Sequence, residues 1–434
     1  MDRIVAALSS VSIPSRFRRD VSLASWRKPV GQEPGSREPE GSQRPLFDWL
    51  VKLARENERA HRRRLGDLRT RADLLRHAAR VRRVLRQVQG LAEWPARTPL
   101  RPRVGPGFCG DGFRVEHVVF ESRPAYYVTA NLYLPAGAPG PLPAVLLCCG
   151  HSLNGKAYPA YQRLAVTLAR LGFAVLIFDP AGQGERDEYV ARRTGRRTVV
   201  RACRAHGAAG LPACLLGSNF GAYRLWDAMR CVDYLQGRPD VDPRRIGATG
   251  TSGGGWESLW LAAIDPRIRA VHANCYFTTF RRRIENRAAD AEPDPEQDPF
   301  DLLGQGIEAS DLILACAPRP VSIGGTTRDF FPVEGLATLA SLAEHREYAW
   351  AAGVVVPEML KHFDLPDVRA ALAPRPLLAV APRDHRDRPL SFAAFRSQGV
   401  SGGGAHVAVA RGLSDPGVAA FLAGRDPENQ EPGA

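Results

Sequence analysis

The clearest pattern along the chain is an alternation of apolar runs and helix-like stretches that begins near residue 143. The apolar runs have the length and continuity of buried strands, and they lie at 144–150, 173–180, 245–250 and 268–276. Between them, apolar residues recur at helical spacing at about 158–171, 221–236 and 254–264. Continuous apolar strands that alternate with helices are typical of a mostly parallel sheet covered by helices on both faces. The pattern therefore predicts an α/β fold.

The residues before this alternation follow a different pattern. Apolar positions at helical spacing predict two helices within 46–92, and "FRVEHVVFES" and "AYYVTANLYLP" predict two strands after them. Residues 1–44 are polar and rich in Gly, Pro and charge, so we expect them to be disordered. We therefore divide the chain into a disordered basic arm (1–44), a helical N-terminal segment (45–103), a core (104–340) and a rearranged C-terminal part that completes the sheet (341–434).

Positive charge is concentrated in the first quarter of the chain. Residues 1–103 contain 24 Lys and Arg against 11 Asp and Glu, whereas the remaining residues contain 35 of each kind. A basic arm can bind nucleic acid or anionic lipid. A solvated helix surface explains the charge more simply, because the whole chain is rich in arginine and has only four lysines. We favour this second interpretation.

Other classes of protein receive little support from the composition. No run of about 18 apolar residues indicates a membrane span, and the first 20 residues lack the pattern of a secretory signal, so we expect a cytoplasmic protein. The eight cysteines have no CxxC spacing, and we interpret them as reduced, mostly buried thiols. The histidines are scattered, no HExxH motif occurs, and no GxGxxG follows the first apolar strand. We therefore expect neither a metal nor a cofactor.

The sharpest chemical signal is "RIGATGTSGGGWESLWLAA", which places a G-x-S-x-G motif, Gly250 to Gly254, between a predicted strand and a predicted helix. That context is the one in which a nucleophile elbow exposes a serine hydroxyl at the edge of a sheet. The backbone N–H of Gly253 would lie at the helix N-terminus, where it can stabilise an oxyanion. Ser252 is therefore the candidate nucleophile, and a glycine-rich turn with an incidental serine is the alternative.

A second element supports the first. The stretch "CCGHSLNGK", residues 148–156, leaves a predicted strand and enters a loop. A loop in this position can supply the other oxyanion donor, here the backbone N–H of His151 or Ser152. His151 is less suited to be the base, because it precedes Ser252 by about 100 residues on a different strand end.

These motifs together resemble the α/β-hydrolase superfamily, and more narrowly its acetyl xylan esterase-like branch. The similarity rests on "CCGHSLNGKAYPAYQ", "FDPAGQGERDEY", the region of Ser252 and "GIEASDLILACAPRPVSIGGTTRDFF", in that order, and covers about residues 104–340. It implies a serine esterase whose nucleophile, acid and base follow one another in the order Ser, Asp, His. It also implies that Ser252 is the nucleophile, Asp329 is the acid, and the 182–186 stretch "GQGER" is a structural loop.

The sequence departs from that family after residue 340, where no His-Gly-type loop follows Asp329. His345 and His362 occur there, but neither follows an obvious strand. Instead, "LPDVRAALAPRPLLAVAPRD" repeats the layout of "ASDLILACAPRPVSIGGTTRD", and each copy ends in an aspartate. No second G-x-S-x-G occurs. We infer a tandem arrangement that has lost the end of its first unit and most of its second.

The repeat leaves two models for the acid and the base. In the first model the second copy becomes the last strand of the sheet, so Asp329 is the acid and His385 is the base. In the second model Asp384 is the acid and His406 is the base, although His406 would precede a strand rather than follow it. We prefer the first model. A third possibility is that the chain has no competent base.

The resulting functional hypothesis is a serine hydrolase that cleaves a small-molecule carboxylic ester through an acyl-enzyme on Ser252. The alternative is a catalytically impaired hydrolase fold that binds a ligand or a partner without turnover, and the missing histidine loop motivates it. The long charged segment "RRRIENRAADAEPDPEQDPFDLLGQG" can cap the pocket.

Overall fold

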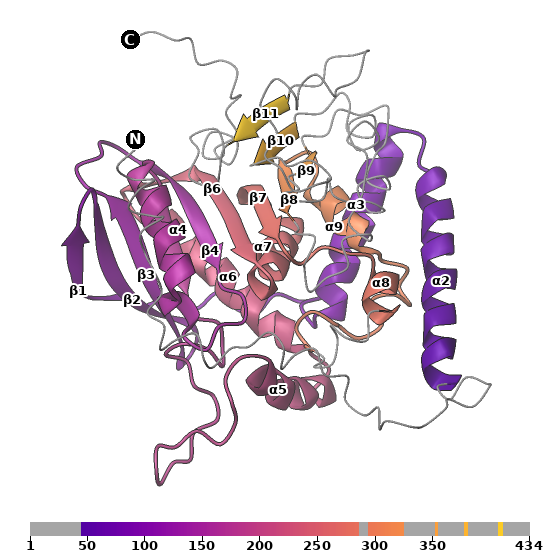
Figure 1. Cartoon of the computed structure of the whole chain (residues 1–434), viewed down its shortest axis with the longest axis horizontal. Coiled ribbons are helices and arrows are strands. Elements are labelled where there is room, and N and C mark those ends of the chain that lie inside the picture. The colour runs from indigo at the N-terminus through magenta and orange to yellow at the C-terminus, as the bar shows by residue number, and fades with distance from the viewer. Residues whose placement is uncertain (1–44, 286–293, 325–351, 355–376, 381–406, 411–434) are drawn as a thin grey trace, which may run out of the picture. The chain divides into compact units, whose positions relative to one another are not determined.

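A computed structural model describes residues 45–285, 294–324, 352–354, 377–380 and 407–410. Its main element is a nine-stranded sheet in the order β1-β2-β3-β5-β4-β6-β7-β8-β9 (Figure 1). The strands are β1 Arg103–Gly110, β2 Phe113–Arg123, β3 Tyr126–Pro135, β4 Leu142–Cys148, β5 Ala174–Phe178, β6 Val241–Thr251, β7 Ile268–Asn274, β8 Val321–Gly324 and β9 Ala352–Val354. The first three strands and their junction with β5 are antiparallel, and the pairs from β5 to β9 are parallel.

Helices connect and cover these strands, as the alternation in the sequence predicts. They are α2 Pro45–Gly66, α3 Arg71–Val88, α4 Pro159–Arg170, α5 Cys203–Leu215, α6 Phe220–Gln236, α7 Gly253–Ile264, α8 Phe280–Glu285 and α9 Ala309–Cys316, with a 3₁₀ turn, η3, at Gly155–Ala157. None of these described helices is both long enough and apolar enough to cross a lipid bilayer.

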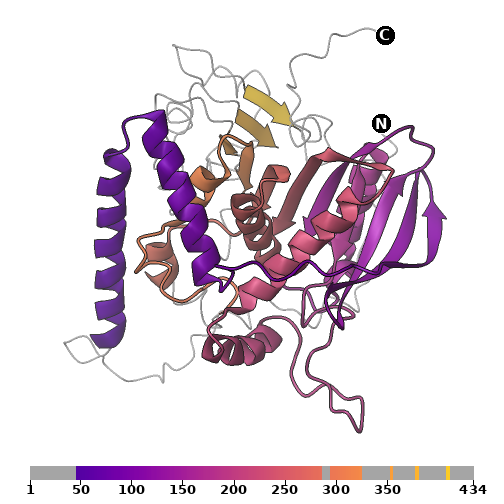
Figure 2. The ribbon, with the colours of Figure 1, turned by 180° about the vertical axis from the view of Figure 1, so that it is seen from behind.

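Both faces of the parallel strands are buried, which explains their continuous apolar sequences. Along β4, Ala144, Leu146 and Cys148 belong to one apolar core, whereas Val145 and Leu147 belong to another. The first core contains residues of α3, α6, α7 and α9, and the second contains residues of α4, so the helices lie on opposite faces of the sheet (Figures 1 and 2). The prediction of an α/β-hydrolase-type sheet covered on both faces is confirmed.

The N-terminal segment contains two helices, α2 and α3, as the sequence predicts, and they span residues 45–88. Thr70 caps α3 in a capping box with Asp73, because the Thr70 side chain accepts the Asp73 N–H while the Asp73 carboxylate accepts the Thr70 N–H. Several arginines of this segment turn toward the core and donate to carbonyl oxygens. These bonds are Arg64 to Gly306, 2.7 Å, Arg80 to Gln305, 2.6 Å, and Arg82 to Ala315, 3.0 Å. Part of the positive charge therefore serves packing, and nucleic-acid binding by residues 1–44 stays a prediction.

The thiols and the C-terminal strands test two further expectations. All eight cysteines lie in the part of the chain that the structure describes, and all are free, as predicted, but only four of them are buried. The strand of the second repeat copy, β10 Leu377–Val380, does not become the last strand of the main sheet. It pairs in parallel with β11, Val407–Ala410, while β9 occupies the sheet edge beside β8. A sheet edge accepts a single strand, so β9 takes the place that the first model of the repeat gave to the second copy.

Candidate active site

Ser252 lies at a sharp turn between β6 and α7, in the position that a nucleophile elbow requires. Its backbone has φ of 60° and ψ of −124°, a conformation that residues with a side chain rarely adopt. Such a conformation costs on the order of 1–3 kcal/mol and persists only where the surroundings enforce it. Two hydrogen bonds do so here: the Ser252 N–H donates to the Asn274 carbonyl and the Trp256 N–H donates to the Ser252 carbonyl, both at 2.9 Å.

Two glycines let the neighbouring backbone approach this turn. A Cβ on Gly254, in the first turn of α7, would overlap the carbonyl oxygen of Cys148 at the end of β4. A Cβ on Gly150, in the loop after β4, would overlap the carbonyl oxygen of Thr251 and would lie 3.3 Å from the Ser252 Cβ. The loop after β4 is therefore packed directly against the elbow.

The loop after β4 carries the two backbone N–H groups that the sequence suggested as oxyanion donors. The Ser152 N–H donates to the Gly150 carbonyl at 2.9 Å, so of the two donors considered from the sequence His151 is the better candidate. The Gln183 amide fixes the loop by donating to the carbonyls of Gly150 and Ser152, both at 2.9 Å. Gly253 begins α7, and the first N–H groups of a helix have no partner within the helix.

The 182–186 loop braces the site, as the resemblance implied. Arg186 is buried, and its guanidinium donates to Asp227 at 2.8 Å and to the Asp179 carbonyl at 3.1 Å. Lys156 forms ion pairs with Asp179 and Glu185. These contacts hold the ends of β4 and β5 together.

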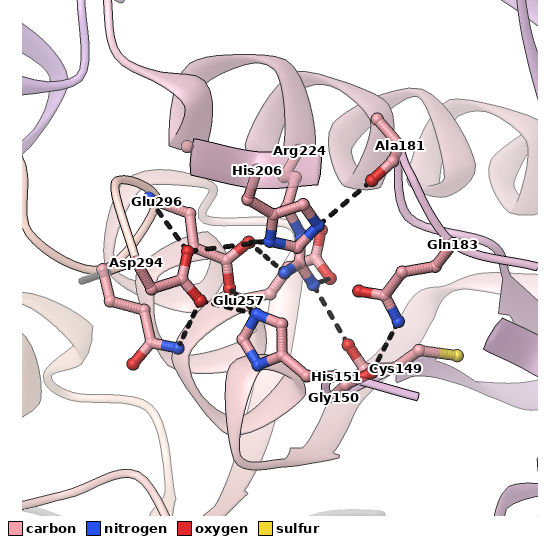
Figure 3. A network of polar contacts seen from close by, with 12 residues as sticks. Cys149, Gly150, His151, Ala181, Gln183, His206, Arg224, Glu257, Asp294 and Glu296 are labelled. Atoms are coloured by element: carbon pink, nitrogen blue, oxygen red, sulfur yellow. Dashed lines mark hydrogen bonds and ion pairs between the residues drawn. The ribbon is translucent and has the colours of Figure 1, made fainter. Parts of the chain in front are cut away.

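The side chain of His151 belongs to a cluster of four polar side chains that was not predicted from the sequence (Figure 3). Its Nε2 lies 2.6 Å from Asp294 Oδ2 and 3.2 Å from Glu296 Oε1. His206 of α5 lies on the other side of the same carboxylates, with its Nδ1 3.4 Å from Glu296 Oε2 and 3.6 Å from Asp294 Oδ1. The centroids of the two imidazole rings are 5.1 Å apart. We call these four residues the His/carboxylate cluster.

Charge in and behind this cluster is strongly coupled. Burial lowers the pKa of His151, but the carboxylates of Asp294 and Glu296 outweigh that effect and hold the pKa well above its usual value. Arg224 is fully buried and forms ion pairs with Glu296 and, at 2.7 Å, with Glu257. Burial raises the pKa of Glu257 to about 7, although Arg224 opposes this shift.

The sequence contained only a weak signal for the cluster. Asp294 and Glu296 come from the long charged segment that we expected to cap the pocket, and the D-x-E spacing of two side chains is their only local mark. His151 and His206 precede Asp294 by 143 and 88 residues. The expectation that the histidines are scattered was wrong for these two, because the fold brings them together.

The remaining predicted site residues lie outside the described part of the chain. These are Asp329, Asp384, His385 and His406. The described strand β8 ends at Gly324, next to the Asn274 side chain. Which acid and which base accompany Ser252 stays a prediction.

Part of the core is similar to a known protein family. Residues 107–294, which include Ser252 and three of the four cluster residues (all but Glu296), match the acetyl xylan esterase (AXE1) family. A candidate hydrolase of Bacillus subtilis (strain 168), YtaP, is 28% identical over 227 residues, covering 50% of this chain and 69% of the relative. The uncharacterized protein PA2218 of Pseudomonas aeruginosa is 28% identical over 188 residues, covering 43% of this chain and 40% of the relative.

Solved structures support the fold. A candidate acetyl xylan esterase of Bacteroides fragilis has a TM-score of 0.54 and 16% identity, covering 76% of this chain and 86% of that chain. The methylesterase BT1017 has a TM-score of 0.50 and 22% identity, covering 72% of this chain and 66% of that chain. The chain therefore has the α/β-hydrolase fold, and residues 107–294 are similar to the acetyl xylan esterase family.

Proposed function

We propose that this protein is a serine esterase that hydrolyses a carboxylic ester through an acyl-enzyme on Ser252. The observation that carries the proposal is the backbone of Ser252, whose φ of 60° puts a serine in a strained turn between a buried strand and a helix. Strain of this kind is maintained where it positions a reactive group. The family match favours a small acyl group such as acetyl, since the family is described as acetyl xylan esterases.

The mechanism follows from the groups around the turn. A base removes the Ser252 proton while the hydroxyl oxygen attacks the ester carbonyl, and a tetrahedral oxyanion forms. The backbone N–H groups of Gly253 and His151 donate to that oxyanion, and one such donor contributes about 10²–10³ to kcat. The alcohol then leaves with a proton from the base, and water hydrolyses the acyl-enzyme by the same steps in reverse.

The acid and the base belong to this proposal too. We propose Asp329 and His385, with Asp384 and His406 as the alternative pair. The pairing of β10 with β11 weakens the argument for His385, because that argument made β10 the last strand of the main sheet. The two histidines are therefore tested side by side.

The experiment combines labelling by a fluorophosphonate probe with p-nitrophenyl acetate hydrolysis, on the wild type and on Ser252→Ala, His385→Ala and His406→Ala. Ser218→Ala, a serine outside the elbow, is the matched control. We expect Ser252→Ala to lose labelling and to lower kcat by about 10⁴-fold or more. The histidine whose removal gives a loss of similar size is the base.

Two outcomes would contradict the proposal. Equal labelling of wild type and Ser252→Ala would place the reactive serine elsewhere. A folded wild type with neither labelling nor turnover would favour the alternative of a hydrolase fold that binds a ligand without catalysis.

A further inference from the structure

The His/carboxylate cluster joins three segments that are distant in the sequence. His151 comes from the loop after β4, His206 from α5, and Asp294 and Glu296 from the segment that precedes α9. The ligand atoms of the four side chains all lie within 4.8 Å of one another. His206 and Glu296 are fully buried, Asp294 is 4% exposed, and the His151 side chain is 14% exposed. A small ion could therefore reach the cluster from the side of His151.

The orientation of His206 defines which of its nitrogens faces the carboxylates. Its Nε2 lies 3.1 Å from the Ala181 carbonyl oxygen. A carbonyl oxygen only accepts, so Nε2 carries the hydrogen of that bond. In the neutral ring Nδ1 then presents a lone pair to the carboxylates of Asp294 and Glu296, at 3.6 and 3.4 Å. A ring nitrogen fixed by a carbonyl on its far side is the usual arrangement of a histidine that binds a metal.

Several donor atoms in the cluster contact one another as ion pairs but form no hydrogen bond. His206 Nδ1, His151 Nε2 and Glu296 Oε1 are buried and have no partner in hydrogen-bond geometry among the described residues. Burying polar atoms in this way is costly unless something else binds them. Glu296 has its other oxygen, Oε2, in the ion pair with Arg224, so Oε1 is left for a ligand.

The segment that supplies the carboxylates is docked independently of the cluster. Pro295 packs against α5 at Gly210, where any Cβ would overlap its ring. The Asn219 amide donates to the Pro295 carbonyl at 2.6 Å, and the Gln89 amide donates to the Glu296 carbonyl at 3.4 Å. The cluster is thus held by contacts outside it, and its four donors are arranged in advance.

We propose that His151, His206, Asp294 and Glu296 bind one divalent cation of the zinc class. Bonds of about 2.0–2.2 Å to nitrogen and oxygen in a tetrahedron place the ligand atoms a little over 3 Å apart. The observed separations between nitrogen and oxygen run from 2.6 to 3.6 Å. Imidazole and carboxylate donors together suit Zn²⁺ better than Mg²⁺ or Ca²⁺, which prefer all-oxygen sites.

The charges fit this cation as well. Asp294 and Glu296 bring two carboxylates to the cluster, and Arg224, which pairs with Glu296 from behind, is shared with Glu257. The carboxylates of the cluster therefore keep a net negative charge that a divalent cation neutralises. In the competing arrangement no metal binds and the two imidazole rings contact the carboxylates directly, which predicts no metal uptake.

The test measures zinc on the full chain. Purified protein is dialysed against a chelator, supplied with ZnCl₂, and its zinc content, zinc affinity and melting temperature are determined. His206→Gln and Asp294→Asn each remove one ligand with little change of volume, and His117→Gln, an exposed histidine on β2, is the matched control. We expect about one zinc per chain and a higher melting temperature with zinc in the wild type and the control.

In the two ligand variants we expect zinc affinity to fall by more than about 10-fold and the thermal shift to disappear. No zinc uptake by a folded wild type would overturn the proposal, and so would equal uptake by the wild type and both variants, which would place the ion at other histidines. The visible spectrum of the Co²⁺-loaded wild type gives a readout that needs no variant. A spectrum without tetrahedral bands would also overturn the site.

Discussion

Asp311 is one of the residues through which the N-terminal helices attach to the core, and its replacement tests that contribution. His61 of α2 and His77 of α3 donate from Nε2 to its two carboxylate oxygens, at 2.9 and 2.7 Å. A carboxylate only accepts, so both Nε2 atoms carry hydrogen. Asp311 is fully buried, and it also accepts the Glu308 N–H at 3.1 Å in the capping box of α9.

The contacts of Asp311 give the expected size of the stability loss. A hydrogen bond to a charged group contributes about 1.5–3 kcal/mol, and breaking a buried ion pair at one partner costs about 3–5 kcal/mol. In Asp311→Asn one amide oxygen can still accept, but the amide NH₂ faces the other imidazole N–H. We expect the free energy of unfolding to fall by about 3 kcal/mol.

The assay is urea unfolding followed by far-UV circular dichroism at pH 7. Asp67→Asn, at an exposed site just after α2, is the control and should change stability by no more than about 0.5 kcal/mol. His61→Leu should lose at least about 1 kcal/mol less in the Asp311→Asn background than in the wild type, because the two residues share one interaction. If Asp311→Asn unfolded like the control, the attachment through Asp311 would be refuted.

The pH dependence of stability is a second test of the role of Asp311. Burial raises the pKa of Asp311, but the hydrogen bonds from His61 and His77 outweigh it and hold the pKa well below the usual range. A carboxyl with a depressed pKa stabilises the fold above its unfolded pKa of about 3.9 and loses that contribution as the pH falls further. The stability difference between wild type and Asp311→Asn should therefore be full at pH 5–7 and shrink below about pH 4.

Two further predictions concern a buried acid and the loop beside Ser252. Burial raises the pKa of Glu308 to about 7, so the native state holds a proton that the unfolded chain releases, and stability should fall by roughly 3 kcal/mol between about pH 4.5 and 7. Glu308→Gln should remove that fall in urea titrations at several pH values, and parallel profiles for the two proteins would contradict the assignment. Gly150→Ala should lower esterase kcat by about 100-fold, because a Cβ there would overlap the Thr251 carbonyl and displace the proposed oxyanion loop. Gly237→Ala, where a Cβ meets nothing closer than 3.5 Å, should keep wild-type kcat, and equal activity of the two variants would argue against the loop's role.

The sheet could be predicted from the sequence because its signal is local. Burial on both faces requires consecutive apolar residues, and Val145 and Leu146 meet that requirement on opposite sides of β4. The elbow is local as well, since its strand, turn and helix are contiguous around Ser252. Each of these features could be read within a window of about 20 residues.

The His/carboxylate cluster and the sheet edge could not be predicted in the same way. His206 lies in a helix whose sequence does not mark it as a site, and tertiary contacts such as the packing of Pro295 on Gly210 bring the carboxylates to it. The edge strand β9 has three residues, too few for an alternation of apolar and polar positions to be recognised. Nothing in its sequence distinguishes it from the strand of the repeat copy, which pairs with β11 instead.

His151 connects the two proposals through different atoms. In the proposed mechanism its backbone N–H donates to the oxyanion beside Ser252, whereas its Nε2 faces Asp294 and Glu296. A ligand fixed at Nε2 would restrict the loop after β4, and the position of an oxyanion donor matters at the scale of about 1 Å. The cation would therefore act on turnover only through the position of that N–H. Because His206 shares the cation but is not part of the proposed oxyanion site, His206→Gln separates the loss of zinc from the loss of the esterase machinery.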